Sequence, residues 1–409
     1  MRILFAIFLL IVNFIVLQVP SSVWCYELGS GKYAIDIHGS ASQGYIYSKD
    51  NNILVVDTEG GTFEFNEFLI NGTMNILPNL RFGAQLLSRR FGDYGFNNQI
   101  KLDWGYFDYN VDTWLGLRLG RVKLPIGFYH EIVDIDIARS TIWLPPLYLR
   151  ELRDFYSNGD GAVMYGSFML NRLGRWDYQV ILADTEQDQG NSLEYEITHD
   201  NFLKGKGNSY CEYLYGGKLF WESPVRGLHL GYSYMKWVDG KSNMTLESDL
   251  LTLLGIPQGS PLHFYYDSGK LLFYSLEYTY KNFILSSELS RFTTETSVDE
   301  LRFIPQFDKY VQKFGGWYVQ LSYRWNNWLS TSVGYSTWYR DFHNRNHSNT
   351  YDFFRESYGA LCFDLMDNLT FKIEAHHVNG LMYVWYDRNP ANDRKNNFMF
   401  YACKVSMYF

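Results

Sequence analysis

The chain has 409 residues, of which 19% are aromatic, yet its mean hydropathy is only −0.24. After its first 25 residues no apolar run reaches the length of about 18 residues that crosses a bilayer as a helix, so a bundle of membrane-spanning helices is excluded. The 36 basic and 44 acidic residues give a net charge of −8, and this balance excludes the basic surface that nucleic acids require.

The chain begins with a segment that predicts a signal peptide. One charge, Arg2, precedes a run of about 17 mostly apolar residues, and small side chains follow near Ser21. We therefore expect residues 1–25 to be a signal peptide that is removed on secretion. The alternative is a membrane-spanning anchor, because the run is close to the length that spans a bilayer.

After residue 30, strand-like runs are joined alternately by tight turns and by long polar loops. Asn, Asp, Gly and Pro supply the geometry of the tight turns. Seven short joints and eight long joints make fifteen connections, which predict sixteen strands. The short joints lie at 77–79, 110–112, 172–174, 223–227, 281–282, 326–327 and 367–368, and the long joints at 49–61, 90–97, 125–160, 184–209, 238–270, 294–314, 340–354 and 379–396.

Within these runs, apolar and polar side chains alternate as they do along a strand with two different faces. In residues 100–106, for example, the predicted apolar face holds Ile100, Leu102, Trp104 and Tyr106. An even number of strands, with short turns at one end and long loops at the other, is typical of a transmembrane barrel. The predicted fold class is therefore all-β: a transmembrane antiparallel β-barrel of 16 strands with short periplasmic turns and long extracellular loops.

The two ends of the barrel sequence are predicted to pair. The last strand ends on Phe409, whose side chain falls on the apolar face, and the first strand is predicted over Tyr33–Ser48. Pairing them closes the ring and leaves no unpaired sheet edge in lipid. Three cysteines lie in the predicted strands, with Cys211 and Cys403 expected outside and Cys362 inside; their odd number argues against a disulfide framework.

These features resemble a Gram-negative outer-membrane porin. The terminal "VSMYF" is similar to the end of such barrels, and "GRVKLPIG", residues 120–127, is similar to a stretch in proteobacterial porins, including phosphate-selective-porin-like ones. The resemblance implies that residues 26–409 form a barrel in the cell outer membrane, with 125–160 folded into the lumen as the constriction loop. It also implies a homotrimer, contact with lipid and lipopolysaccharide, and passive diffusion of small hydrophilic solutes and ions.

Charged side chains on the wet face are the candidates for lining the pore. Alternation places six basic residues inward, and the expected constriction loop supplies acids, so that opposed charges would create a field across the channel. The candidates are Arg81, Arg89, Lys101, Arg118, Lys218 and Arg324 with Glu131, Asp134 and Asp136. Because the chain is acidic, we expect a slight preference for cations.

No catalytic residue, metal site or cofactor is predicted. His376 and His377 are adjacent, so their rings face opposite sides of a strand and cannot share a metal. The alternative function is an outer-membrane barrel enzyme or an adhesin that acts through its extracellular loops. It would predict His, Ser and Asp side chains clustered at one rim of the barrel and a plugged lumen.

Overall fold

The computed structural model describes residues 26–29, 31, 34–54, 56–92, 97–148, 156–187, 205–246, 249, 251–304, 308–343, 349–385, 388–390 and 392–409. The predicted signal peptide, residues 1–25, lies outside these ranges. None of the helices within these ranges has the length and apolar character to cross a membrane. The helical segments in them are single 3₁₀ turns: η2 (His130–Ile132), η3 (Asp136–Ala138), η4 (Pro146–Tyr148), η6 (Asn171–Leu173), η7 (Thr252–Leu254), η8 (Asp299–Leu301) and η9 (Thr350–Asp352).

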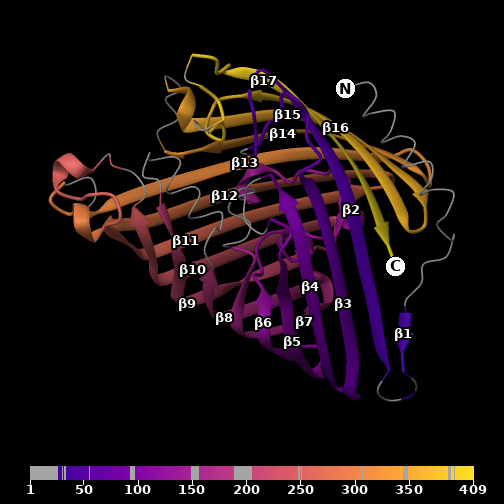
Figure 1. The fold of residues 1–409 in the computed structure, drawn as a ribbon. Coiled ribbons are helices and arrows are strands. Elements are labelled where there is room, and N and C mark those ends of the chain that lie inside the picture. The colour runs from indigo at the N-terminus through magenta and orange to yellow at the C-terminus, as the bar shows by residue number, and fades with distance from the viewer. Residues whose placement is uncertain are drawn as a thin grey trace.

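Antiparallel strands form one closed wall, each bonded to its neighbours along the chain (Figure 1). The described part of the wall contains β2 (Ile35–Lys49), β3 (Phe65–Leu77), β4 (Leu80–Phe91), β5 (Ile100–Asp112), β6 (Leu115–Lys123), β7 (Asn158–Met169), β8 (Arg175–Gln187), β9 (Gly205–Glu222), β10 (Leu228–Leu246), β11 (Pro261–Tyr280), β12 (Phe283–Val298), β13 (Tyr310–Arg324), β14 (Leu329–Tyr339), β15 (Phe353–Met366), β16 (Leu369–Asn379) and β17 (Asn397–Tyr408). These are the sixteen strands that the sequence predicts, and the all-β antiparallel barrel is confirmed.

The ring closes where β17 pairs with β2, from Met399 opposite Lys49 to Tyr408 opposite Ser40. Beyond that pair, the backbone of Phe409 exchanges two hydrogen bonds of 3.0 Å with Gly39. A Cβ atom on Gly39 would lie 2.4 Å from the Phe409 ring, so only glycine lets the ring pack over the backbone there. A further short strand, β1 (Tyr26–Leu28), continues along the same edge of β2.

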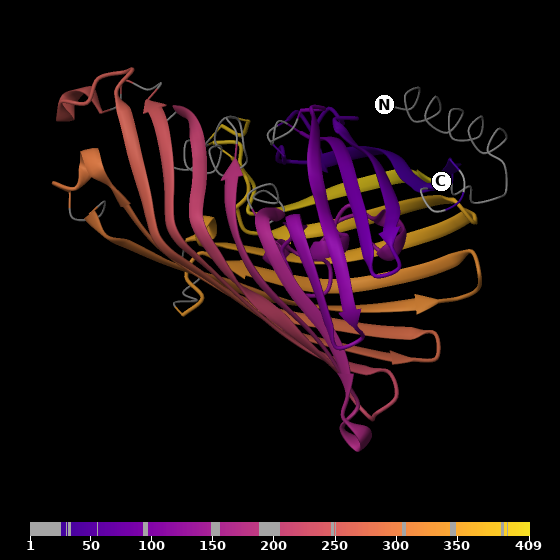
Figure 2. The same ribbon diagram turned by 90° about the horizontal axis from the view of Figure 1, so that it is seen from below.

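The connections also follow the predicted alternation, with two differences. The turn between β5 and β6 falls at 113–114, because residues 110–112 still belong to β5. The long joint predicted at 238–270 is much shorter, since β10 continues to Leu246 and β11 begins at Pro261. Every second side chain of this stretch, Ser242, Met244 and Leu246, is buried inside the wall, as expected of a strand and not of a loop. The neighbouring strands β9, β10 and β11, of 18, 19 and 20 residues, are therefore the longest of the described wall (Figure 2).

Three predicted side-chain orientations, in β5 and β9, are wrong because these strands contain irregularities. The register between β4 and β5 shifts at Asp103, so Trp104 and Tyr106 lie opposite the inward Gln85 and Gly83. An extra residue in a strand turns all later side chains to the other face. A similar shift between β8 and β9 turns Cys211 inward, where it is 2% exposed.

Candidate pore and loop constriction

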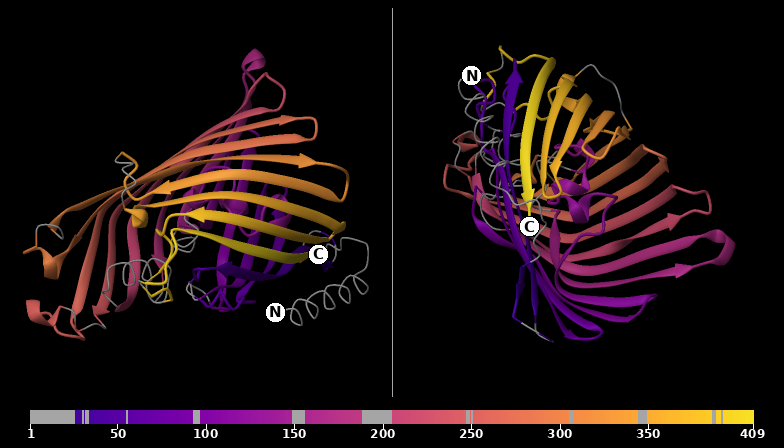
Figure 3. Two further views of the ribbon diagram at one scale, coloured as in Figure 1. Left: turned by 90° about the horizontal axis from the view of Figure 1, so that it is seen from above. Right: turned by 90° about the vertical axis from the view of Figure 1, so that its right-hand side faces the viewer.

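The described residues of the connection between β6 and β7, 124–148 and 156–157, are called loop 3 below and lie inside the ring of strands (Figure 3). The first residues of loop 3, 124–127, are the end of the GRVKLPIG stretch, whose last residue, Gly127, has a positive φ of 54°. A Cβ atom there would lie 2.4 Å from the Tyr148 hydroxyl and 2.8 Å from a Glu288 carboxylate oxygen. Glycine is therefore required where the chain turns from the wall into the lumen.

The first attachment of loop 3 is the carboxylate of Glu288, which is 1% exposed on the inner face of β12. It accepts hydrogen bonds from the Tyr148 hydroxyl and from the backbone N–H of Phe128 at 3.0 Å. From the wall it accepts the hydroxyls of Ser275 at 2.6 Å and Tyr318 at 3.1 Å. Burial and Glu288 raise the pKa of Tyr148 well above its ordinary value, so this hydroxyl remains a donor.

The second attachment joins loop 3 to two other strands of the wall, β8 and β9. The Glu131 carboxylate forms an ion pair with Lys218 of β9 and accepts a hydrogen bond of 3.2 Å from Gln179 of β8. Burial alone would raise the pKa of Glu131, but Lys218 outweighs it and the pKa is lowered. The carboxylate is therefore ionised near neutral pH. Loop 3 thus contacts β8 and β9 as well as β12.

The third attachment is a buried ionic cluster centred on Asp136. Its carboxylate lies 2.6 Å from Arg139 and 2.7 Å from Lys404 of β17, and it accepts the Ser406 hydroxyl at 2.8 Å. Lys404 also contacts Glu67 of β3 at 2.6 Å. Burial alone would raise the pKa of Asp136, but the lysine and arginine charges lower it. Breaking such a buried pair costs about 3–5 kcal/mol, because it leaves an uncompensated charge.

The fourth attachment holds the apolar middle of loop 3. The backbone N–H groups of Ile142 and Trp143 donate to Glu374 of β16. His376 of the same strand lies between Glu374 at 3.0 Å and Glu356 at 2.9 Å, and these side chains are almost fully buried. The wall thus offers a line of charged side chains that fixes the path of loop 3.

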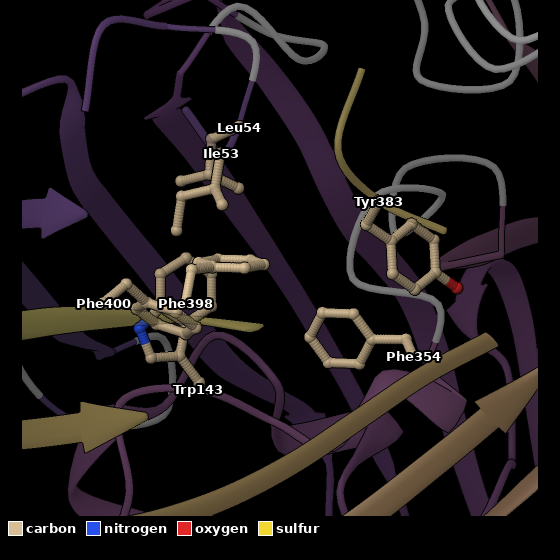
Figure 4. A pocket seen from close by; sticks show the side chains of 7 residues that line it. All are labelled: Ile53, Leu54, Trp143, Phe354, Tyr383, Phe398 and Phe400. Atoms are coloured by element: carbon tan, nitrogen blue, oxygen red, sulfur yellow. The ribbon is translucent and has the colours of Figure 1, made fainter. Parts of the chain in front are cut away.

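Above these attachments, on the side of the long loops, aromatic side chains fill the interior. Trp143 stacks on Phe65 with ring centroids 5.4 Å apart and meets Phe91 and Phe400 edge-on. Nearby lies an apolar cavity of about 20 Å³ whose lining residues are labelled in Figure 4. A cavity of that size holds at most one water molecule, and an apolar one stays dry. We therefore exclude it as a ligand site.

Solvent-exposed charges of the inner wall gather at the end with the short turns. Arg81 is 48% exposed and lies 3.2 Å from Asp108, which Arg118 approaches at 3.6 Å. On the other side, Arg324 is 55% exposed and contacts Asp364 at 3.0 Å. Basic and acidic groups thus occur in pairs around this mouth of the barrel.

The remaining candidates from the sequence lie elsewhere. Lys101, at the loop end of β5, is half-buried, whereas Arg89 is 6% exposed. Asp134 is 4% exposed and pairs with Lys123 at 2.5 Å, and Asp136 is buried in the cluster described above. Arg89, Asp134 and Asp136 are therefore covered by protein, and the two acids attach loop 3 to other side chains.

Several residues that position loop 3 were missed by the sequence reasoning: Glu288, Glu374, Lys404, Tyr148 and Lys372, whose ammonium donates to the backbone oxygens of Asp136 at 2.6 Å and Arg139 at 2.8 Å. Each of the four charged ones occupies an inward position of a strand, where alternation already indicates a wet face. The missing information was the partner, because a carboxylate in the wall is an anchor only when loop donors reach it. Nothing in the order of residues pairs Glu288 with Tyr148, which lies 140 positions away.

A closed sixteen-stranded wall with short turns at one end and an inward-folded loop has the fold of the Gram-negative outer-membrane porins, as the resemblance implied. No family model matches the chain, and no curated protein matches its sequence. Solved structures do match its fold.

One match is an outer-membrane protein of Vibrio cholerae, OmpT, with a TM-score of 0.56 and 9% identity, over 94% of this chain and 100% of that one. An anion-selective porin from Comamonas acidovorans has a TM-score of 0.55 and 12% identity, over 92% of this chain and 100% of its own. OmpF of Salmonella typhi, in complex with daunomycin, has a TM-score of 0.54 and 11% identity, over 94% and 100%. At these identities the likeness concerns the fold.

Proposed function

We propose that the chain is an outer-membrane porin: a channel for passive diffusion of small hydrophilic solutes and ions, in which loop 3 sets the narrowest point. The observation that carries this proposal is loop 3 itself. It lies inside the closed sixteen-stranded wall and is attached to several of its strands. A barrel of sixteen strands is wide enough for an aqueous lumen, whereas eight strands are filled by their own side chains.

The geometry favours a narrow channel. The exposed inner charges lie at the mouth with the short turns, and the interior above loop 3 is packed with aromatic side chains. Flow therefore depends on how loop 3 lies, and we expect a small conductance in the state described. Because acids and bases are paired at the mouth, we expect only a weak preference for cations.

Planar-bilayer recording of the purified, refolded protein tests the proposal. Stepwise current increments of small and uniform size are the expected result, and the reversal potential in a salt gradient then measures the ion preference. Folded barrels that give no steps, with loop 3 attached or released, would contradict the channel.

The homotrimer is part of the same proposal. Cross-linking in mild detergent tests it, and a single monomeric species would argue against it.

The packed interior favours one second candidate, a barrel that acts through its extracellular loops as an enzyme or adhesin. The buried His376 cluster does not support catalysis, because a catalytic group must reach its substrate and His376 is 1% exposed. Absence of any current, together with binding to a host or bacterial surface, would favour this candidate over the channel.

A further inference from the structure

Loop 3 carries two large apolar side chains that are open to solvent. Ile135 is 37% exposed and Ile137 is 50% exposed, whereas Ile142, Leu144 and Leu147 of the same loop are at most 7% exposed. Because loop 3 lies inside the ring of strands, these two side chains meet the water of the lumen or its mouth and not the lipid (Figure 3). A solute that enters the barrel therefore meets isoleucine.

The acids that alternate with these isoleucines point the other way, toward the wall. Asp134 is 4% exposed and pairs with Lys123 at 2.5 Å, and Asp136 is 3% exposed and pairs with Lys404 at 2.7 Å. The sequence predicted the two acids as pore-lining groups. In the structure they attach the loop, and the apolar side chains next to them face the solvent.

Backbone hydrogen bonds hold this stretch in place. The N–H of Ile135 donates to the backbone oxygen of Ile132 at 3.0 Å, and its own backbone oxygen accepts the N–H of Ala138 at 3.1 Å. Together with the two ion pairs, these turns fix the backbone on both sides of Ile135. The isoleucines therefore cannot turn away from the solvent unless buried ion pairs break, which is costly.

The stretch lies close to the mouth with the short turns. Ser406, which donates to Asp136 at 2.8 Å, is two residues from the end of β17 at Tyr408. Lys372, which donates to the backbone oxygen of Asp136 at 2.6 Å, is three residues from the start of β16 at Leu369. At ~3.4 Å per residue, both contacts are about 7–10 Å from the ends of their strands. The isoleucines are thus near the level of the exposed charges of this mouth.

Those charges of the wall are paired. Besides the two salt bridges described above for this mouth, the Nδ1 atom of His229 in β10 lies 3.7 Å from a carboxylate oxygen of Glu277 in β11. A charge that already has a partner attracts a passing ion less strongly. An ion at the isoleucines therefore gives up water without gaining a counter-charge from them, and this loss is unfavourable.

Apolar side chains at a narrow point act differently on the two kinds of solute. They hinder ions, because a narrow apolar passage expels the water that an ion needs. A neutral solute with an apolar face loses little there, since contact with isoleucine removes apolar surface of both partners from water.

We propose that Ile135 and Ile137 form an apolar constriction that determines which solutes pass: neutral solutes with an apolar face, such as deoxy sugars, in preference to ions and to fully hydroxylated sugars. This selectivity rests on the proposed channel function and names the class of solute that loop 3 favours. It assigns the choice of solute to the isoleucines and not to Asp134 and Asp136.

A pair of double variants with side chains of the same shape tests the apolar constriction. Ile135→Thr with Ile137→Thr is compared with the matched control, Ile135→Val with Ile137→Val, and the two differ only in that hydroxyl groups replace methyl groups. The single-channel conductance of the threonine variant in KCl is expected to be about fivefold larger than that of the valine variant, which is about the effect of one net hydrogen bond. The valine variant should conduct like the wild type.

Swelling of liposomes that contain the barrel measures the choice between neutral solutes. In the wild type and the valine variant, 6-deoxygalactose should enter about twofold faster than galactose, because one fewer hydroxyl meets the isoleucines. In the threonine variant the ratio of the two rates should fall toward one. The difference in size between the two sugars is the same for all variants, so it cannot produce this change.

The outcomes separate this selectivity from the channel itself. A wild-type barrel that passes neither ions nor sugars would contradict the proposed channel, and the apolar constriction with it. A conducting barrel whose threonine and valine variants have the same conductance and the same ratio of sugar rates would overturn the apolar constriction alone. If the double threonine variant folds poorly, Ile137→Thr against Ile137→Val makes the same comparison, with an expected difference of about twofold.

Discussion

Tyr148 is the side chain of loop 3 whose removal should release the loop with the least change elsewhere. Its hydroxyl donates to Glu288 and accepts the backbone N–H groups of Phe128 at 2.9 Å and Tyr129 at 3.1 Å. Tyr148→Phe removes these bonds and keeps the ring that packs against Phe273 at 5.3 Å.

The magnitude follows from the groups left behind. A hydrogen bond to a charged group contributes about 1.5–3 kcal/mol, and an orphaned buried N–H costs about 1–3 kcal/mol. Phe128 keeps a partner in Glu288, whereas the N–H of Tyr129 loses the one bond described for it. Relaxation recovers part of the sum, so we expect about 3 kcal/mol of local destabilisation, or about a hundred-fold increase in loop opening.

Hydrogen–deuterium exchange of residues 124–148 in detergent measures this opening, and bilayer conductance measures its effect on the channel. The control is Tyr165→Phe, because the Tyr165 hydroxyl also donates to a carboxylate, Asp108 at 2.6 Å, but does not contact loop 3. Faster exchange and a larger conductance are expected in the Tyr148 variant alone. Equal protection in both variants would refute the attachment through Glu288.

Three other changes have distinct expected outcomes. Gly39→Val places atoms within the Phe409 ring and should cost about 1–3 kcal/mol at the closing seam, seen as a lower temperature at which the folded barrel loses its gel mobility. Arg118→Gln leaves the charge of Asp108 less compensated and should shift the reversal potential toward cations, whereas Asp108→Asn should shift it toward anions. Because Lys218 lowers the pKa of Glu131 from 4.5, the ion pair between them is present at higher pH and is lost as the pH falls below that value. The conductance should therefore stay constant above pH 4.5 and rise in more acidic buffer. A rise already at neutral pH would contradict this.

The wall was predictable from the sequence because each of its rules is local. Alternating side chains, turn residues and an even strand number depend on neighbours along the chain. Predictions failed where a strand gained a residue, as at Asp103, since one extra residue turned Trp104 and Tyr106 from lipid to lumen. The stretch 238–246 failed for a related reason: polar residues that indicate a loop continue as a strand when their backbone pairs with β11.

The interior was less predictable, because it depends on contacts between distant residues. The sequence placed charges on the wet face, and Glu131 of loop 3 does pair with Lys218 of the wall. It gave no means of distinguishing exposed charges such as Arg81 from buried ones such as Asp136, because burial depends on where loop 3 packs against the wall. The path of that loop is set by Glu288 and Glu374, whose partners lie far away in sequence.

The most direct test of the account asks whether loop 3 lies across the lumen in the folded barrel. The hydroxyl oxygens of Ser140 in the loop and Ser322 in β13 are 3.2 Å apart. In a background with the native cysteines replaced by serine, Ser140→Cys with Ser322→Cys should cross-link under mild oxidation, and reduction should restore the conductance of the uncross-linked barrel. A folded barrel in which these two cysteines never join would contradict the inward loop, and with it the proposed constriction.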